Sequence, residues 1–169
     1  MRELLTKLIA AYGPSGNEEH ISKVIEDEIE GYVDEITTDV MGNLIAVKRG
    51  NGKGKKVMLS AHMDQIGLMV THIDDKGFLR FSNVGGISVL NTINNKVIFE
   101  NGVVGTVSYE SEIDDIKEIK LDRMYIDIGA TNKEEASKQV SIGDVAVYYS
   151  PLSDSNGRYI GGAMDNRAG

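Results

Sequence analysis

The chain has 169 residues, of which 26 are acidic and 18 basic, so its formal net charge is −8 at pH 7. This length allows one ordinary domain or two small ones with a real hydrophobic core, and the acidic balance gives no general attraction to nucleic acid or anionic lipid. Because there is no cysteine, disulfide frameworks and thiolate sites are excluded, and His, Asp and Glu are the only strong metal ligands available.

The N-terminus, MRELLTKLIA, mixes charged with apolar residues and lacks the apolar core of a signal peptide. No stretch of the sequence approaches the roughly 18 apolar residues of a membrane-spanning helix. We therefore expect a cytoplasmic protein that binds neither membranes nor nucleic acid.

Two amphipathic helices are predicted at the start of the chain. Apolar residues recur at helical spacing over Leu4–Ile9, and this first helix should end near Gly13. A second helix is expected from about Asn17 to Glu30, and the spacing of Ser15 and Glu18 predicts a capping box at its start.

Strand patterns follow the helices. VDEITTD and NLIAVKRG predict a hairpin around Gly42, and the apolar run VMLSA at 57–61 predicts a further strand, which together favour an α/β layer. Beyond about Gly67, six short β-branched segments are separated by Gly, Asn or Asp turns, a pattern that predicts a barrel or sandwich of about 90 residues. The six segments are GLMVTHID, GFLRFSNV, KVIFENG, VVGTVSY, MYIDIGA and VAVYYSPL.

Two segments interrupt this β pattern. YESEIDDIKEIKLD at 109–122 is dense in charge and is expected to be a solvated or disordered excursion. TNKEEASKQV at 131–140 predicts one short helix capped by Thr131 or Asn132.

The candidate chemistry begins with SAHMDQIG. Residues i and i+2 of an extended segment face the same side, so His62 and Asp64 are placed like a metal ligand and the carboxylate that orients it. Taken alone, this pair more often marks a structural hydrogen bond. Asp165, in the glycine-flanked tail GGAMDNRAG beside Asn166 and Arg167, is a second candidate, since distant loops commonly meet at one sheet edge to form a site.

Other candidates have weaker support. His20 lies on a charged helix and His72 in a strand, and we expect both at the surface. The pairs Gly85-Gly86 and Gly161-Gly162 match no phosphate-loop pattern, and Ser60 has no nucleophile-elbow context. We therefore expect neither a nucleotide site nor a serine hydrolase.

The ordered motifs as a whole resemble a known family, the dinuclear-metal aminopeptidases, which includes glutamyl, deblocking and tetrahedral aminopeptidases. Some of its members are labelled endoglucanase or cellulase. The resemblance runs in order over nearly the whole chain but covers only the front part of a family member. It is carried by GPSGNEE, DVMGNLIA, LSAHMDQIGLMV, DDKGFLRFSNVGG, MYIDIGA and GGAMDNRAG.

The resemblance implies an α/β fold with two domains. An αβα-sandwich catalytic domain, with a central sheet between helices, would be interrupted by an inserted all-β, barrel-like dimerisation domain. Residues 1–67 and 159–169 would form the catalytic domain, and residues 68–158 the insert.

The resemblance also implies roles for three residues and a cofactor. His62 would bind one of two divalent ions, Zn²⁺ or Co²⁺, Asp165 would bridge both ions, and Asp64 would be the catalytic residue that orients the His62 ring. Gln65 replaces a glutamate that is usual in the family. The family's general-base glutamate and three further ligands would lie beyond Gly169, so we expect these residues alone to have negligible peptidase activity.

The function implied for the parent protein is metal-dependent aminopeptidase activity, in which a metal-activated water releases N-terminal residues from peptides. The enzyme would be a homo-oligomer, with dimers building a larger particle. Two alternatives stay open. A glycoside hydrolase would need a flanking carboxylate pair, although three phenylalanines and no tryptophan offer little sugar-stacking surface, and an inactive oligomerisation module could use apolar strands around Gly85-Gly86-Ile87.

Overall fold

The computed structural model describes residues 1–113 and 115–168 and divides the chain into two compact units. The first unit combines Met1–Asp64 with Pro151–Gly169, and the second, here called the barrel unit, is Gln65–Ser150. The barrel unit thus begins at 65 rather than 68 and ends at 150 rather than 158. The later difference arises because β9 (Ser153–Ser155) and β10 (Arg158–Ile160) pair with each other and not with the barrel.

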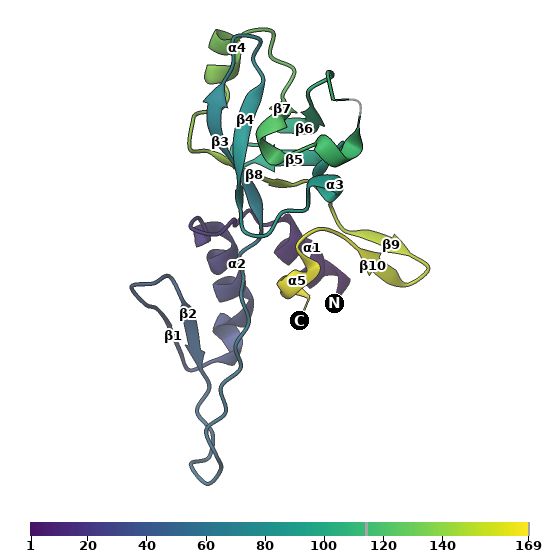
Figure 1. Ribbon diagram of the computed structural model, residues 1–169. Helices are drawn as coiled ribbons and strands as arrows, with labels where there is room; N and C mark the ends of the chain where they lie inside the picture. The colour runs from purple at the N-terminus through teal and green to yellow at the C-terminus, as the bar shows by residue number, and fades with distance from the viewer. Residues whose placement is uncertain (114, 169) are drawn as a thin grey trace. The chain divides into compact units, whose positions relative to one another are not determined.

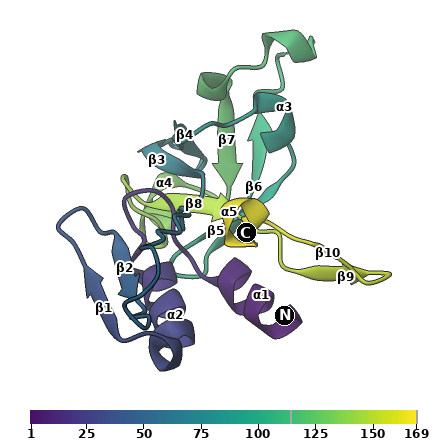
Figure 2. The ribbon, with the colours of Figure 1, turned by 90° about the horizontal axis from the view of Figure 1, so that it is seen from below.

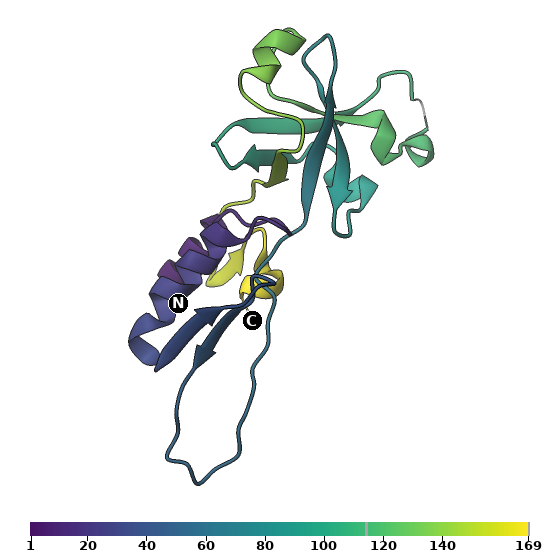
Figure 3. The same cartoon turned by 90° about the vertical axis from the view of Figure 1, so that its left-hand side faces the viewer.

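The two predicted helices open the first unit. They are α1, Arg2–Ala10, and α2, Glu19–Ile29, which runs into the 3₁₀ turn η1, Glu30–Tyr32. The helices pack against each other (Figure 3), and their buried apolar residues follow the predicted stripes. These buried residues are Leu5 and Ile9 of α1 and Ile21 of α2.

The predicted capping box at the start of α2 is wrong. Glu18 is the N-cap residue and accepts no capping hydrogen bond, while its carboxylate accepts one from the Gly16 N–H at 2.7 Å. The Ser15 hydroxyl instead donates to the carboxylate of Asp64, 49 residues further along the chain. A hydrogen bond to a charged oxygen is stronger than one to a neutral backbone group, which favours the long-range partner.

The predicted hairpin is confirmed. Strands β1, Glu35–Thr38, and β2, Leu44–Val47, pair antiparallel in the first unit (Figure 2). The Asp39 carboxylate closes the turn by accepting hydrogen bonds from the backbone N–H groups of Met41 and Asn43, each at 2.9 Å. Gly42 lies in this turn with φ of 84°, a left-handed conformation that glycine adopts without strain.

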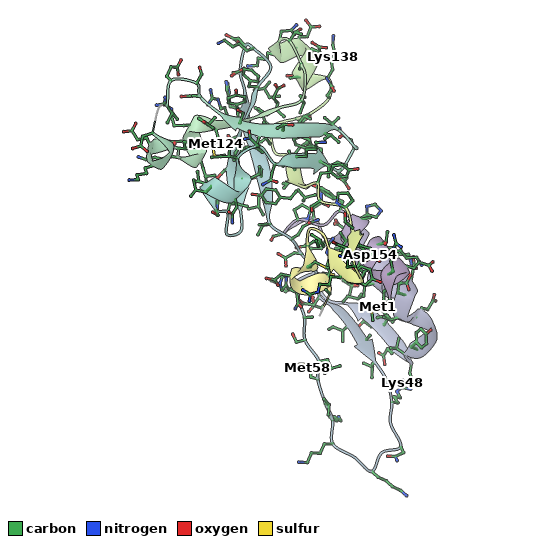
Figure 4. All side chains as sticks on the ribbon, turned by 90° about the vertical axis from the view of Figure 1, so that its right-hand side faces the viewer. Met1, Lys48, Met58, Met124, Lys138 and Asp154 are labelled. Atoms are coloured by element: carbon green, nitrogen blue, oxygen red, sulfur yellow. The ribbon has the colours of Figure 1, made fainter. Side chains whose placement is uncertain are left out.

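The strand predicted at VMLSA is not formed. In the described part of the chain, residues 57–61 are extended but pair with no other strand. Val57, Met58 and Leu59 are 82%, 88% and 93% exposed, and Figure 4 shows Met58 on this isolated segment. An apolar run predicts a buried strand only where a neighbouring strand accepts its backbone hydrogen bonds and other elements cover its side chains.

The first unit therefore contains, in its described residues, two separate two-stranded sheets, β1–β2 and β9–β10. The central sheet of the expected αβα sandwich is not among them. That architecture stays a prediction, whereas the barrel predicted for the following residues is present.

The barrel unit consists of six antiparallel strands that close into a barrel in the order β3-β4-β7-β6-β5-β8 (Figure 1). Every strand falls in one of the six predicted segments. The strands are β3 Gly67–Ile73, β4 Leu79–Val84, β5 Lys96–Phe99, β6 Val104–Tyr109, β7 Met124–Asp127 and β8 Val145–Tyr148.

The barrel core is built by the period of two along its strands. In β6, Val107 is fully buried, and Gly105 lies so close to Ile126 of the adjacent β7 that an added Cβ would come within 2.5 Å of the Ile126 side chain. Burying apolar side chains of this size stabilises the fold by about 1.5–3 kcal/mol each. Buried members of this core on the strands include Leu68, Val70, Leu79, Phe81, Val97, Phe99, Val107, Met124, Ile126 and Ala146.

The charged segment 109–122 is more ordered than expected. Asp114 lies outside the described residues, but the segment forms two 3₁₀ turns, η2 Ile116–Glu118 and η3 Leu121–Arg123. Ile119, between them, is only 6% exposed and joins the barrel core. The prediction failed because one apolar anchor is enough to hold a charged connection against a core.

The barrel unit also contains two short helices among its described residues, α3, Val89–Thr92, and α4, Lys133–Ser137. Asn132 caps α4, as predicted, by accepting a hydrogen bond from the Glu135 N–H at 2.9 Å. Among the described residues, no helix is both long and apolar enough to cross a membrane.

Candidate metal centre

The predicted pair His62 and Asp64 is in direct contact in the first unit. Asp64 Oδ1 lies 2.9 Å from His62 Nδ1, and the Asp64 backbone carbonyl oxygen lies 3.2 Å from the same nitrogen. The i, i+2 spacing of an extended segment brings both groups to one side. Asp64 therefore holds one ring nitrogen and leaves Nε2 to face elsewhere.

Ser15 fixes the other oxygen of Asp64. Its hydroxyl donates to Asp64 Oδ2 from the loop between α1 and α2. This hydrogen bond lowers the pKa of Asp64 below its usual value, with a further contribution from His62, while partial burial works in the opposite direction. The carboxylate is thereby kept ionised and fixed in orientation.

Asp165 meets the free nitrogen of the ring. Its Oδ1 lies 3.2 Å from His62 Nε2, although the two residues are 103 positions apart in the sequence. The hydrogen bonds with Asp64 and then with Asp165 raise the pKa of His62 above 6.5. The structure thus brings together all three predicted site residues.

No role was predicted for Arg167, yet its charged side chain is buried in the first unit. Its side chain lies in α5, Met164–Arg167, two residues beyond Asp165, and the residue is 7% exposed. Burial lowers the pKa of Arg167 to about 10, and the negative charge of Asp64 partly opposes this effect. The sequence placed Arg167 beside Asp165, but nothing local indicates that its guanidinium turns inward.

The donor atoms fit a divalent ion. Typical zinc–nitrogen and zinc–oxygen bonds place two ligands of a tetrahedral ion about 3.3 Å apart, and His62 Nε2 and Asp165 Oδ1 are 3.2 Å apart. Their side chains are 52% and 97% exposed, so an ion has access. Within residues 1–113 and 115–168, no three His, Asp or Glu side chains are arranged to hold a metal, so His62 and Asp165 would need further ligands.

The two other histidines of the chain make no contact with His62, Asp64 or Asp165 in the hydrogen bonds and ion pairs of the described residues. His20 on α2 and His72 on β3 are both exposed, in agreement with the expectation that they lie at the surface. Gln65, which follows Asp64 in the sequence, belongs to the barrel unit.

Comparison with known proteins places these features in context. A family model described as M42 glutamyl aminopeptidase matches residues 42–169. A putative aminopeptidase of Acetivibrio thermocellus is 54% identical over 169 residues, which is 100% of this chain and 51% of that protein.

Two solved structures are similar over nearly the same share. An endoglucanase from Thermotoga maritima has a TM-score of 0.86 and 38% identity, covering 98% of this chain and 50% of that one. The Pyrococcus horikoshii TET1 peptidase, whose description gives assembly into a tetrahedron or a large octahedral shell, has a TM-score of 0.76 and 36% identity, covering 92% and 48%. This chain thus spans about half the length of the relatives it matches.

Proposed function

Since this chain belongs to the M42 glutamyl aminopeptidase family, we propose that it forms part of a metal-dependent aminopeptidase that releases N-terminal residues from peptides. The observation that carries the proposal is His62 held between Asp64 and Asp165, with its ring nitrogens 2.9 and 3.2 Å from the two carboxylates. The chain spans about half of its relatives, so the activity proposed is that of the whole protein.

In this proposal His62 Nε2 and Asp165 would hold the divalent metal, two ions of Zn²⁺ or Co²⁺, with Asp165 as a ligand common to both. Imidazole nitrogen and carboxylate oxygen are donors that both of these ions accept. What such ions supply when bound is Lewis acidity toward a water molecule and a peptide carbonyl.

The residues of this chain prepare the site for that chemistry. Asp64 accepts from His62 Nδ1, which fixes the ring orientation, keeps the lone pair on Nε2 and raises the basicity of that nitrogen. The Ser15 hydroxyl prevents Asp64 from rotating away, because it occupies the second carboxylate oxygen. Asp64 is therefore proposed to act on the reaction through His62.

The wider assignments belong to the same proposal. The first unit is the catalytic domain, completed to an αβα sandwich in the whole protein, and the barrel unit is the inserted dimerisation domain. Assembly into a homo-oligomer built from dimers is supported by the tetrahedral and octahedral particles described for the TET1 peptidase. We also propose peptides as substrates and the cytoplasm as the location.

The glycoside hydrolase alternative is less well supported. Glycosidases need two carboxylates separated by about 5–9.5 Å across a sugar. Asp64 and Asp165 instead both contact one imidazole ring, which occupies the space between them. The endoglucanase description of one similar structure remains a statement about that protein.

The decisive experiment measures metal content and hydrolysis of a panel of aminoacyl-p-nitroanilides. We expect negligible turnover from the 169-residue chain, and turnover sensitive to EDTA once the chain is extended to the length of its relatives. In the extended protein, His62→Ala should lower kcat/KM by at least about 100-fold, whereas His72→Ala, the control on β3, should not. An extended protein that binds no metal and cleaves no peptide would overturn the proposal.

A further inference from the structure

The candidate metal centre is made by two segments with little regular structure. His62 and Asp64 follow the extended residues 57–61, which pair with no strand in the described chain. Asp165 lies in α5, but its φ of −85° and ψ of 110° are not helical, and its side chain is 97% exposed. Backbone hydrogen bonds of a helix or sheet therefore do not fix the distance between the two segments.

Arg167 supplies a direct link between them. Its Nε donates to the backbone carbonyl of Met63 at 3.1 Å, and Met63 is the residue between His62 and Asp64. Arg167 itself is two positions beyond Asp165. One hydrogen bond between residues 104 positions apart thus joins the backbones that carry the proposed ligands.

The rest of the guanidinium is anchored to a third segment. Nη1 donates to the carbonyl oxygens of Leu8 at 2.9 Å and Ala11 at 2.6 Å, and Nη2 donates to that of Gly13 at 3.5 Å. These acceptors lie in the last turn of α1 and in the loop that leads to Ser15. The same side chain therefore also sets the position of the loop whose serine holds Asp64.

Only arginine can make this set of contacts. Its planar fork donates in several fixed directions, whereas a lysine ammonium is a compact charge that would not reach all four carbonyls at once. Carbonyl oxygens also compensate, through charge-assisted hydrogen bonds, for the cost of burying the guanidinium. The Arg167 guanidinium and the four carbonyl groups that it contacts, those of Leu8, Ala11, Gly13 and Met63, are here called the clamp.

Gly13 is part of the same packing. A Cβ at this position would come within 2.9 Å of Arg167 Nη2 and 2.4 Å of Ile21 Cγ2. A side chain here would therefore push the guanidinium out of place without changing Arg167 itself. This gives an independent way to disturb the contacts.

We infer that Arg167 is a positioning residue that fixes the His62–Asp64 segment, the Ser15 loop and Asp165 at the separation needed to hold a divalent ion. It touches none of the proposed reacting atoms and acts through backbone carbonyls. The inference rests on the proposed function for its link to metal binding, but its geometric part can be tested separately.

The test compares Arg167→Lys and Gly13→Ala with Leu5→Ala, in the protein extended to the length of its relatives. Leu5 is a buried residue of α1 outside the clamp, so its substitution controls for general loss of stability. Two quantities are measured: hydrogen–deuterium exchange of the backbone amides of residues 61–65, and the affinity for Co²⁺ added alone. Exchange reports local opening of the segment, which a uniform loss of stability does not concentrate there.

Both clamp variants should accelerate exchange at 61–65 at least about tenfold relative to Leu5→Ala, and should weaken Co²⁺ binding about 10- to 100-fold. Exchange and affinity equal to those of Leu5→Ala in Arg167→Lys would overturn the inference. Accelerated exchange in a chain whose wild type binds no Co²⁺ would support the positioning role and count against the proposed function. Co²⁺ binding that is equally tight in wild type and Arg167→Lys would count against the positioning role of Arg167 and support the metal binding of the proposed function.

Discussion

At the scale of single residues, the local spacing of His62 and Asp64 matters less than the partners that reach them. A histidine and an aspartate two positions apart are common, but here each ring nitrogen of His62 faces a carboxylate and Asp64 is held by Ser15. The resulting pKa shifts, raised for His62 and lowered for Asp64, are consequences of these hydrogen bonds. The protonation of His62 and Asp64 can therefore be followed by titration.

We expect the cluster to contribute to stability in a defined pH range. Because its pKa is raised in the fold, His62 stabilises the metal-free protein fully below pH 6.5, and this stabilisation is lost as the pH rises through the folded pKa. Because its pKa is lowered in the fold, Asp64 stabilises the protein above pH 3.8, and this stabilisation is lost as the pH falls through the folded pKa. The contribution should thus be largest between these values, at no more than about 1 kcal/mol because the groups are partly exposed.

The measurement is thermal unfolding of wild type and His62→Ala from pH 3 to 9, with NMR titration of the His62 ring. The difference between the two proteins should shrink above the folded pKa of His62. A constant difference across this range, or an NMR pKa below 6.5, would contradict the hydrogen bonds described. Co²⁺ should compete with the proton and bind less well as the pH falls.

At the scale of elements, the stability of the short helix α4 depends on the hydrogen bonds at its N-terminus. The helix α4 has five residues, too few to be stable by propensity. Asn132 accepts from the Glu135 N–H, and Glu135 in turn accepts from the Thr131 N–H at 2.9 Å and from its hydroxyl at 2.8 Å. The two hydrogen bonds from Thr131, backbone first, also lower the pKa of Glu135.

Asn132→Ala should therefore lower the free energy of unfolding by about 1 kcal/mol, the usual cost of losing an N-cap side chain. Asn132→Asp keeps an acceptor and should change it by only a few tenths of a kcal/mol. Urea unfolding of the 169-residue chain measures the free energy of unfolding of both variants. Equal stability of Asn132→Ala and wild type would mean that Glu135 and Thr131 hold the helix start without Asn132.

At the scale of the whole molecule, the chain contains one closed barrel and one unit assembled from two distant parts of the sequence. The barrel unit, Gln65–Ser150, includes every strand of the closed sheet and the connected apolar core. A closed barrel has no edge strand left to cover. Its stability is therefore expected to be independent of the first unit.

We expect residues 65–150, produced alone, to fold with a cooperative thermal transition and a β-type circular dichroism spectrum. Leu79→Ala, which removes a fully buried side chain, should cost about 2–5 kcal/mol in this piece, and Lys138→Ala, at the exposed C-cap position of α4, should cost almost nothing. A broad, non-cooperative transition would show that the barrel needs the first unit. Native mass spectrometry of the same sample tests whether the barrel forms dimers.

The sequence by itself determined the elements whose signals are local. Short β-branched segments between Gly, Asn or Asp turns predicted all six barrel strands, Gly42 predicted the hairpin turn, and the pair Thr131 and Asn132 predicted the start of α4. The motif order also indicated the family, and with it the three candidate site residues. The signals for strands, turn and cap depend on neighbours within a few positions, and the motif order depends on the sequence alone, so neither requires knowledge of tertiary contacts.

Only the tertiary structure decided which partners are used. Ser15 gives its hydrogen bond to Asp64 instead of capping α2, and Ile119 anchors a segment that its charges predict to be solvated. Residues 57–61 pair with no strand of the described residues, although their composition favours one. Arg167 reaches carbonyls between 104 and 159 positions away. No local pattern encodes such contacts, because their free energy depends on what the folded chain brings within hydrogen-bonding distance.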